Sequence, residues 1–537
     1  MEATGNSLEK NVETNAETED IDDKIYPPLK KVMPAMLAVS LVFFLVALDR
    51  TIIGTAIPTI SSQFNSFADI SWYESGFLLP ICASQLSFGL IYQYYSTKWV
   101  LLVLTALFEL GSIISAAAPS SNAFIVGRVI SGMGAVGIGP GAFLLVTHLV
   151  PLEKRPKFLG SLGSMFGISS ILGPILGGYL TSVSWRWCFW INVPTGGVAM
   201  VLLVILAPDA PPPCKPATSW RKRILEFDPL GFLLIAPSII CFLFALQFGG
   251  EDQSWSQARV VALFVLFGVF LLGFIACQVW RKENATVPPR IVCQRDILCG
   301  CMIGFSTGSV LVLYTFYLPI WFQVVQSKSP QSSGLSLLPL LLSNVVAIVL
   351  SGFLVSKVGY YTPFSVIGGM MLVAGAALVA TWTVDINEGK SIGYQILTGA
   401  GLGLCLQQPN IVIQTVLSDK DISIGTSIFN FFVFLGGTIF VTASQSLLEN
   451  QLIRKLAGIV PNLDAASLAS SGAGSLKNLV PPDKLDESLN AYNDSMRSIW
   501  YLALGLAGLA LISSFGLRWK SVKVRKINET NTDDTKK

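Results

Sequence analysis

The feature that most constrains this chain is a series of fourteen apolar stretches, each about as long as a bilayer-spanning helix. Such a helix needs about 20 apolar residues, and charged residues or clusters of Pro, Gly and Ser separate one stretch from the next. The stretches lie near residues 33–59, 70–92, 99–118, 122–147, 158–180, 186–207, 227–249, 258–280, 297–322, 332–355, 362–383, 391–417, 422–447 and 497–518. We therefore predict an all-α integral membrane protein with fourteen transmembrane helices.

The composition supports a membrane protein and argues against several other classes. The 537 residues are 52% hydrophobic and only 13% charged, whereas a soluble domain carries roughly 25% charged residues. The net charge of +3 is too small to indicate a nucleic-acid partner. The nine cysteines show neither a disulfide framework nor a zinc-binding spacing. We expect no metal, no cofactor and no enzymatic activity, since no catalytic constellation is present.

The distribution of Lys and Arg between the loops predicts the orientation, because cytosolic loops are enriched in both. With both termini inside, the cytosolic segments hold Lys30, Lys31, Lys98, Lys154, Arg155, Lys157, Lys215, Arg221, Lys222, Arg223, Arg281, Lys282, Arg290, Arg295, Lys357, Lys420 and the cluster from Arg518 to Lys526. The short exterior loops hold only Arg186, Arg259, Lys328 and Lys390. We expect both ends in the cytosol. Asn493 then begins a formal glycosylation triplet in an exterior loop, for which chance is the simpler explanation.

Two segments repeat each other at matched places in the chain. "RVISGMGAVG" at 128–137 aligns without gaps with "QILTGAGLGL" at 395–404, and "GLIYQYYS" at 89–96 corresponds to "GFLVSKVG" at 352–359. Two six-span halves therefore flank an extra pair of spans. Paired halves are typical of secondary transporters, whose substrate site lies where the halves meet.

The predicted organisation follows from the spans, the charges and this repeat. It comprises a disordered cytosolic tail (1–32), an N-terminal six-helix bundle (33–207), a cytosolic linker (208–226), two inserted helices (227–280), a second cytosolic linker (281–296), a C-terminal six-helix bundle (297–518) with an exterior loop (448–496), and a cytosolic tail (519–537).

The fifth span is unusually rich in small residues. "GSMFGISSILGPILGGYL" at 163–180 contains Gly163, Gly167, Gly173, Pro174, Gly177 and Gly178. Small residues let two helices approach closely, and proline kinks a helix. We expect this span to act as a close-packed pivot against the other half of the molecule, with ordinary tight packing as the alternative.

Several motifs in the right order resemble one family. "LGPILGG" (172–178) resembles the GPxxGG signature of antiporters in the major facilitator superfamily, and "LDRTIIGTAIP" (48–58) the first-span signature of its fourteen-span drug:proton antiporters. "WRWCFWINVPTGG" (185–197), "FELGSIISAAAPSS" (108–121) and Arg128 also match. The resemblance covers most of residues 33–530 and is nearest to fungal toxin and multidrug efflux pumps. In the loop after the second span, however, the family's acidic residue is missing, since Gly89 is followed by Gln93, Tyr94, Ser96, Thr97 and Lys98.

Ionisable residues inside spans are candidate functional groups. Asp49, Arg128 and Glu109 are such residues, and Asp49 and Arg128 lie at similar depth. The resemblance places their spans beside a central cavity, so we expect Asp49 to carry a proton, Arg128 to control it, and Glu109 to be a second candidate. A static ion pair is the alternative. Arg50 points about 100° away from Asp49, and we expect it to extend towards the outer headgroups or to meet Asp69 or Glu74.

Polar residues in otherwise apolar spans are candidate cavity liners, although each could instead bond to a neighbouring helix. They are Gln85, Tyr314, Tyr317, Gln323, Asn344, Gln407, Gln408 and Asn430. Walls of this kind suit a bulky, mostly apolar compound held by a few hydrogen bonds.

We predict a monomeric secondary active efflux transporter that exports an amphipathic secondary metabolite, toxin or drug in exchange for protons by alternating access. The plasma membrane is the expected location, with the vacuolar membrane as the alternative. The competing function is proton-coupled transport of a metal chelate, such as a siderophore, or of a basic amino acid. A non-transporting receptor is disfavoured, because only 19 residues follow Arg518.

Overall fold

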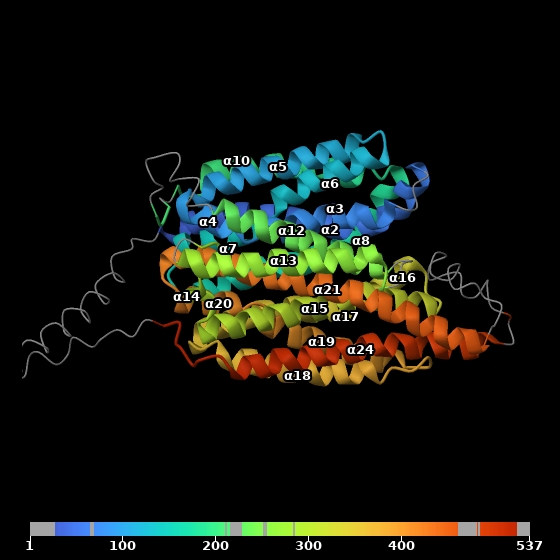
Figure 1. The fold of residues 1–537 in the computed structure, drawn as a ribbon. Coiled ribbons are helices and arrows are strands. Elements are labelled where there is room, and N and C mark those ends of the chain that lie inside the picture. The colour runs from blue at the N-terminus through green and yellow to red at the C-terminus, as the bar shows by residue number, and fades with distance from the viewer. Residues whose placement is uncertain are drawn as a thin grey trace, which may run out of the picture.

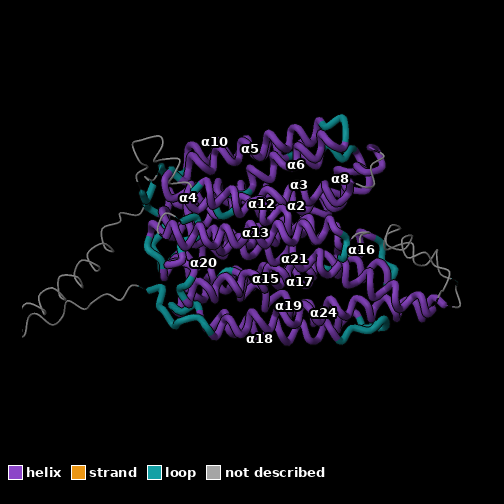
Figure 2. The backbone as a smooth tube through the Cα atoms, in the orientation of Figure 1, coloured by secondary structure: helices purple, strands orange, loops and turns teal. Residues whose placement is uncertain are grey.

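The computed structural model describes residues 27–64, 69–209, 212–214, 228–250, 255–282, 285–459, 481 and 484–523. The first 26 residues of the predicted N-terminal tail, most of the first linker, residues 460–480 and the end of the C-terminal tail lie outside the described residues. Within the described ranges the chain forms long helices that run side by side (Figure 1), with loops gathered at the two ends of the bundle (Figure 2). These ranges contain no β-strand, only an isolated bridge between Tyr360 and Ser521.

The first group of helices is referred to as the N-terminal half. It consists of α2 (Leu29–Phe64), α3 (Ile70–Ser84), α4 (Ser87–Tyr94), α5 (Thr97–Ala117), α6 (Ser121–Ala135), α7 (Ile138–Leu149), α8 (Arg155–Val183), α9 (Trp187–Trp190) and α10 (Asn192–Leu206). The inserted pair consists of α12 (Pro229–Gly250) and α13 (Ala258–Arg281), which the short α14 (Pro289–Val292) follows.

The second group is referred to as the C-terminal half. It consists of α15 (Arg295–Val324), α16 (Pro330–Leu335), α17 (Leu338–Val358), α18 (Thr362–Ala380), α19 (Glu388–Leu406), α20 (Gln408–Val416), α21 (Asp419–Ile459) and α24 (Leu485–Phe515). Local sequence signals set several of these boundaries. Ser120, Ser329 and Asn387 each cap a helix N-terminus with their side chains, and Gly359, at φ 95°, ends α17 in the left-handed conformation that glycine adopts most easily.

The number of membrane spans agrees with the prediction. Among the described residues, twelve helical segments are long and apolar enough to cross a membrane, and fourteen if each of two bent pairs counts as one span. One bend, of 60°, separates α3 from α4, and the other, of 43°, divides α8 between Gly173 and Ile175. Pro174 lies at the second bend, where a proline removes one backbone hydrogen bond of the helix. The prediction of an all-α membrane protein is confirmed.

Both ends of the predicted exterior loop at 448–496 are helical, because α21 continues to Ile459 and α24 already begins at Leu485. Charged residues end the apolar run near residue 449, yet both helices continue into this segment and pack on each other. Leu452 and Leu456 belong to the same hydrophobic cluster as Leu489, and Lys455 lies 3.8 Å from Asp494. A change of polarity marks the end of the bilayer rather than the end of a helix.

The two halves lie next to each other, as the blue-to-teal and yellow-to-red layers of Figure 1. The end of the bundle that holds Leu29 and Phe515 is called the terminal face. There Ser356 Oγ donates a 2.7 Å hydrogen bond to the carbonyl oxygen of Glu153, and Gly352 lies against the backbone of Pro156. Pairs of helices join the halves from the terminal face inwards. Helix α8 packs on α17, and α4 packs on α21.

Asp228 fastens the inserted pair at the terminal face. It caps α12 by accepting the backbone N–H of Gly231, and it also accepts hydrogen bonds from Gln278 Nε2 and from both the N–H and the hydroxyl of Thr286, all at 2.9–3.0 Å. Arg281 lies 3.3 Å away. This group, called the Asp228 cluster, joins the start of α12, the end of α13 and the segment leading to α14. From there Arg290 makes two 3.0 Å hydrogen bonds to Asp421 of α21.

Candidate functional site

Asp49 and Arg128, which the sequence predicts to pair, form a buried ion pair within the N-terminal half. Arg128 Nη1 on α6 lies 2.6 Å from Asp49 Oδ2 on α2, and the two side chains are 1% and 0% exposed. The second carboxylate oxygen accepts a 2.9 Å hydrogen bond from Asn192 Nδ2 at the start of α10. Arg128 Nε also donates to the carbonyl oxygen of Tyr73 at 3.2 Å. Each charge is thus held by at least two groups from different helices.

Glu109 is a neighbour of this pair but not a member of it. Its side chain on α5 is buried, and its charge acts on that of Asp49. Neither carboxyl oxygen has a hydrogen-bond partner among the residues described. Gly196 of α10 leaves the space that Glu109 occupies, since a Cβ there would overlap Glu109 Oε1. The three proton-coupling candidates therefore lie in one region. These three residues and Asn192 are together called the Asp49 cluster.

Three residues of this region were not predicted from the sequence: Asn192, which is part of the cluster, and Phe77 and Phe189, whose rings pack against it. Asn192 Nδ2 bonds to Ser112 Oγ at 3.2 Å as well as to Asp49. The guanidinium of Arg128 lies 4.4 Å from the ring centroid of Phe77 and 5.9 Å from that of Phe189, a favourable cation–π arrangement. Asn192 belongs to the segment "WRWCFWINVPTGG". The one sign in the sequence of its role was that it is a lone amide in an apolar run.

Arg50 points into the protein, so the expectation that it extends towards the outer headgroups is wrong. Its guanidinium lies 5.9 Å from the ring centroid of Phe166 on α8 and 5.6 Å from that of Phe434 on α21. These two rings belong to opposite halves of the molecule. Among the residues described, no ion pair joins Arg50 to Asp69 or Glu74, although the charge of Glu74 acts on it.

A small cavity of about 90 Å³ lies beside Arg50, between the two halves. Its lining is Phe43, Val46, Ala47, Arg50, Phe77, Ile81, Ala135, Val136, Ile138, Gly139, Pro140, Phe166, Asn430 and Phe434. Arg50 and Asn430 are the polar members of this set. Phe77 both lines the cavity and contacts Arg128, so one aromatic ring separates the cavity from the Asp49 cluster. We call this space the central cavity.

Of the eight predicted cavity liners, Asn430 is the one that lines the central cavity. Three others serve the packing of the C-terminal half. The Tyr314 ring stacks on Trp500 with centroids 5.5 Å apart, Tyr317 donates its hydroxyl to the carbonyl oxygen of Val441 at 2.9 Å, and Gln323 donates to Ser333 Oγ at 3.0 Å. Tyr317 and Gln323 thus bond to neighbouring helices, which was the alternative explanation, whereas Tyr314 packs through its ring and its buried hydroxyl has no hydrogen-bond partner among the described residues.

The four remaining liners are buried outside the central cavity. Gln408 donates to the carbonyl oxygen of Leu404 within its own turn, and Gln407 lies against Gly163 at the contact between the halves. Asn344 Oδ1 and both amide atoms of Gln85 have no hydrogen-bond partner in the described part of the chain. Gln85 occupies the bend between α3 and α4.

The glycines of the fifth span divide into two groups. A Cβ on Gly163 would meet Gln407 and Ile348, and one on Gly167 would meet Val345, so these two glycines face the C-terminal half. Gly173 instead packs on Thr51 of its own half, and a Cβ on Gly178 would meet open space. Gly177 is buried near Cys188 Sγ. The expected pivot contact is thus wrong for Gly173 and Gly178, because the bend at Pro174 turns the outer part of α8 away from α17.

Asn493 does not fit a glycosylation site. It lies two turns inside α24 and is 3% exposed. Its Oδ1 accepts a 2.8 Å hydrogen bond from Trp321 Nε1, and its Nδ2 donates to the carbonyl oxygen of Trp382 at 3.1 Å. Both ends of the amide are therefore occupied by the C-terminal half.

The segment after the second span gains an acidic partner from elsewhere. Asp209, beyond the end of α10, accepts hydrogen bonds from Ser96 Oγ at 2.7 Å and Trp99 Nε1 at 3.2 Å. These two bonds lower the pKa of the exposed Asp209 carboxyl. Lys98 donates to the carbonyl oxygens of Val204 and Ala207 at the end of α10. The loop that lacks the family's acidic residue is thus tied within the N-terminal half.

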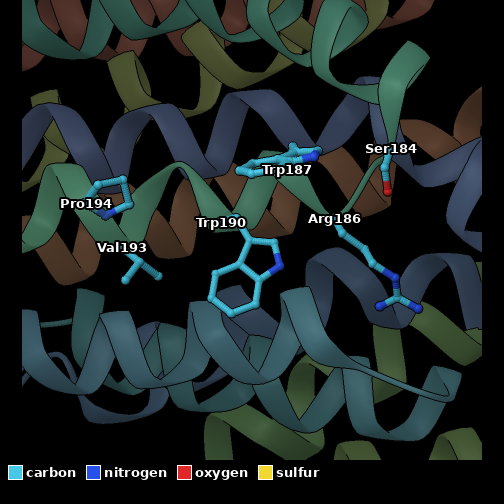
Figure 3. Close-up of a pocket in the computed structure, with 6 residues that line it drawn as sticks. All are labelled: Ser184, Arg186, Trp187, Trp190, Val193 and Pro194. Atoms are coloured by element: carbon cyan, nitrogen blue, oxygen red, sulfur yellow. The ribbon is translucent and has the colours of Figure 1, made fainter.

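A separate groove of about 400 Å³ lies on the outer surface beside α9 (Figure 3). It is lined by Ser184, Arg186, Trp187, Trp190, Val193 and Pro194. Arg186 is engaged there, since it donates to the carbonyl oxygens of Ala116 and Ala118, both at 2.9 Å. Exposed tryptophans are typical of the boundary between bilayer and water, so the groove belongs to the lipid-facing surface.

No group of three His, Cys, Asp or Glu residues that could hold a metal occurs in the ranges that the structure covers.

Comparison with known proteins identifies the family. The sequence model of the Major Facilitator Superfamily matches residues 39–441. This chain belongs to the major facilitator superfamily. The predicted family is thereby confirmed, and the two halves, the cavity between them and the buried charges can be considered as parts of a superfamily transporter.

Curated relatives include "MFS-type efflux pump MFS1" of Trichophyton rubrum, which is 43% identical over 515 residues, 96% of each chain. "Rubrofusarin-specific efflux pump aurT" of Gibberella zeae is 41% identical over 503 residues, 94% of this chain and 92% of the relative. Among solved structures, the proton:xylose symporter XylE matches with a TM-score of 0.58 at 14% identity, over 92% of this chain and 98% of the other. That likeness shows the fold alone.

Proposed function

We propose that this superfamily member is an efflux transporter that exports amphipathic organic compounds, such as a secondary metabolite or toxin, in exchange for protons. Relatives that align over nearly the whole chain bear the name of efflux pump. One observation carries the proton-driven part of the proposal: Asp49 is buried with Arg128 and Asn192, and a second buried carboxyl group, Glu109, lies beside them without a hydrogen-bond partner.

The Asp49 cluster supplies what proton coupling needs. Arg128 and Asn192 hold Asp49 as a carboxylate, and loss of either contact would leave a buried charge that a proton removes at lower cost. An unpaired charge on Glu109 would be costly at its buried position, so in the proposal Glu109 carries its proton while Asp49 is ionised. Phe77 contacts Arg128 and lines the central cavity, which gives substrate in the cavity a route to disturb the pair.

Alternating access is supported by the uneven contact between the halves. Contacts run from the terminal face, where Ser356 bonds to Glu153, to the middle of α8, where Gly167 lies against Val345. Beyond the bend at Pro174, Ile175 and Tyr179 are exposed. In the proposal the two six-helix halves rock about the contact of α8 with α17. The proposal keeps both termini in the cytosol and the plasma membrane as the location.

The central cavity does not favour a basic amino acid as the substrate. Arg50 is the one charged residue in the cavity lining that the structure describes, and it would repel a second cation. The aromatic and aliphatic walls match an organic compound with few charges.

The decisive experiment measures gradient-driven transport by purified protein in liposomes. With the pH gradient imposed, wild-type protein should accumulate a test compound such as rubrofusarin, and a proton ionophore should abolish the accumulation. Asp49→Asn should reduce gradient-driven accumulation about 100-fold, because the exchangeable proton is lost, while exchange of labelled for unlabelled compound persists. Asp385→Asn, at an exposed site outside the cluster, is the control. Normal accumulation by Asp49→Asn would exclude Asp49 as the proton site.

A further inference from the structure

Arg50 is a cation held between aromatic rings from opposite halves. Phe166 on α8 and Phe434 on α21 flank its guanidinium, with centroids 5.9 and 5.6 Å away. The guanidinium has five N–H donors in a planar fork, and none of them bonds to an acceptor within the described ranges. Its nitrogen atoms are also not among the sealed, unpartnered atoms of the interior. The donors therefore stay accessible from the central cavity.

The positive charge of Arg50 has no carboxylate in contact with it, unlike that of Arg128, which pairs with Asp49. Asp49, its neighbour in the chain, is committed to Arg128 and Asn192. Glu74 is near enough for its charge to act on Arg50, but the two form no ion pair within 4 Å in this structure. Asn430, the other polar residue of the cavity lining, donates a hydrogen bond from its Nδ2 to the carbonyl oxygen of Thr426. The cavity thus offers a cation, an amide and aromatic walls.

We propose that the central cavity binds planar aromatic compounds that carry an anionic group, with Arg50 holding the anion and Phe166 and Phe434 flanking the ring. Guanidinium is well suited to this task because it bonds to carboxylate, sulfonate or phenolate oxygens and stacks on aromatic faces at once. In this structure the two phenylalanine rings fill the space beside Arg50 that the ligand's ring would take.

The size of the cavity indicates when binding takes place. A volume of about 90 Å³ is well below the roughly 300 Å³ at which pockets for drug-sized ligands begin. Phe166 and Phe434 sit on different halves, so separation of the halves withdraws one ring from the other and uncovers Arg50. The ligand enters that opening, and its ring inserts between the two phenylalanines beside the guanidinium. The inference rests on the proposed transport function, because it requires the halves to separate.

The test compares two ligands of nearly equal shape and different charge. Naphthalene-2-sulfonate is permanently anionic, and naphthalene-2-sulfonamide is its neutral counterpart. Their affinities for purified wild-type protein are measured by equilibrium dialysis, which does not depend on transport or on a proton gradient. Wild-type protein should prefer the sulfonate, and Arg50→Gln should lower the ratio of sulfonate to sulfonamide affinity about tenfold or more, the effect of losing hydrogen bonds to a charged group.

Matched variants separate recognition from loss of folding. Arg259 stacks on Phe248 at 3.9 Å in the inserted pair, so Arg259→Gln removes a similar cation–π contact outside the cavity and should leave the ratio unchanged. Phe434→Leu should weaken both ligands by similar factors, since it removes a wall and no charge. An unchanged ratio in Arg50→Gln, or no wild-type preference for the sulfonate, overturns the inference. If Arg50→Gln does not fold, Arg50→Lys should lower the ratio by a smaller factor, and an unchanged ratio there overturns it equally.

Liposome transport then distinguishes this inference from the proposed function. Gradient-driven accumulation of the sulfonamide with no accumulation of the sulfonate leaves the efflux function standing and rejects anion recognition. Arg50-dependent binding of the sulfonate with no gradient-driven transport of either compound rejects proton-driven export and supports the binding site.

Discussion

Two buried aspartates, each beside an arginine, are held in different ways. Asp228 accepts hydrogen bonds from Gly231, Gln278 and twice from Thr286, and Arg281 lies 3.3 Å away. Asp49 accepts from Arg128 and Asn192. The Asp228 cluster ties together three segments at an end of the bundle, whereas the Asp49 cluster lies inside one half beside a carboxyl group that has no partner among the described residues.

The difference suggests two roles for the same pair of residue types. Asp228 accepts four hydrogen bonds and lies beside Arg281, so its charge is stabilised in place and it serves as a permanent fastening. Asp49 depends on two donors, and displacement of either one removes a large part of the stabilisation of its charge. A buried aspartate–arginine pair is therefore weak evidence for function by itself, and the number and origin of the donors carry the information.

The largest effect expected from this comparison concerns stability. Asp228→Asn should lower the free energy of unfolding by about 3–5 kcal/mol, since it places an amide against several donors and removes the negative charge beside Arg281. Asp49→Asn should cost much less, because a transporter that protonates Asp49 must tolerate a neutral group there in each cycle. Thermal unfolding in detergent, followed by a thiol-reactive dye that labels the buried cysteines, measures both variants.

The same measurement can reject the comparison. If Asp49→Asn destabilises the protein as strongly as Asp228→Asn does, Asp49 and Arg128 form a static pair that fixes the helix arrangement. Asp385→Asn, at an exposed carboxyl group, should leave thermal unfolding nearly unchanged and serves as the control for loss of one negative charge.

A smaller effect is expected when each aspartate loses a single donor. Thr286→Val removes one of the donors to Asp228 and should cost about 1 kcal/mol of stability without changing transport. Asn192→Ala removes one of two donors to Asp49 and should slow gradient-driven transport about tenfold, a loss equivalent to one hydrogen bond to a charged group. Initial rates in liposomes and thermal unfolding, measured on both variants, decide the matter. A large transport defect in Thr286→Val would show that the Asp228 cluster also takes part in the cycle.

The sequence was sufficient for the helical spans and for the pairing of Asp49 with Arg128. Apolar runs of bilayer length permit few structures other than transmembrane helices, and two opposite charges at similar depth have strong reason to meet. The extension of α21 to Ile459 was not predictable from hydropathy, because polar and charged residues interrupt the apolar run over its last turns.

The direction of Arg50 and the role of Asn192 were beyond the sequence for a different reason. Helix periodicity separates Arg50 from Asp49 by about 100°, but it does not tell which of the remaining neighbours faces Arg50. That choice depends on the crossing of α2 with α8 and α21, which only the assembled halves determine. An amide such as Asn192 likewise has many potential partners, and its bond to Asp49 follows from the position where α10 begins.

The smallest effect concerns pH and should appear only for the Asp228 cluster in acid. Burial alone would raise the pKa of Asp228, but the hydrogen bonds from Gln278, Gly231 and Thr286 outweigh it and lower the pKa. A carboxyl group whose pKa is lowered on folding contributes stability above its unfolded pKa and loses it as the pH falls through the folded value. The stability difference between wild type and Asp228→Asn should thus stay constant from pH 7 to 5. It should shrink only below about pH 4, near the ordinary aspartate pKa. A difference that already changes between pH 7 and 5 would mean that Asp228 exchanges protons in the neutral range, and the contrast with Asp49 would fail.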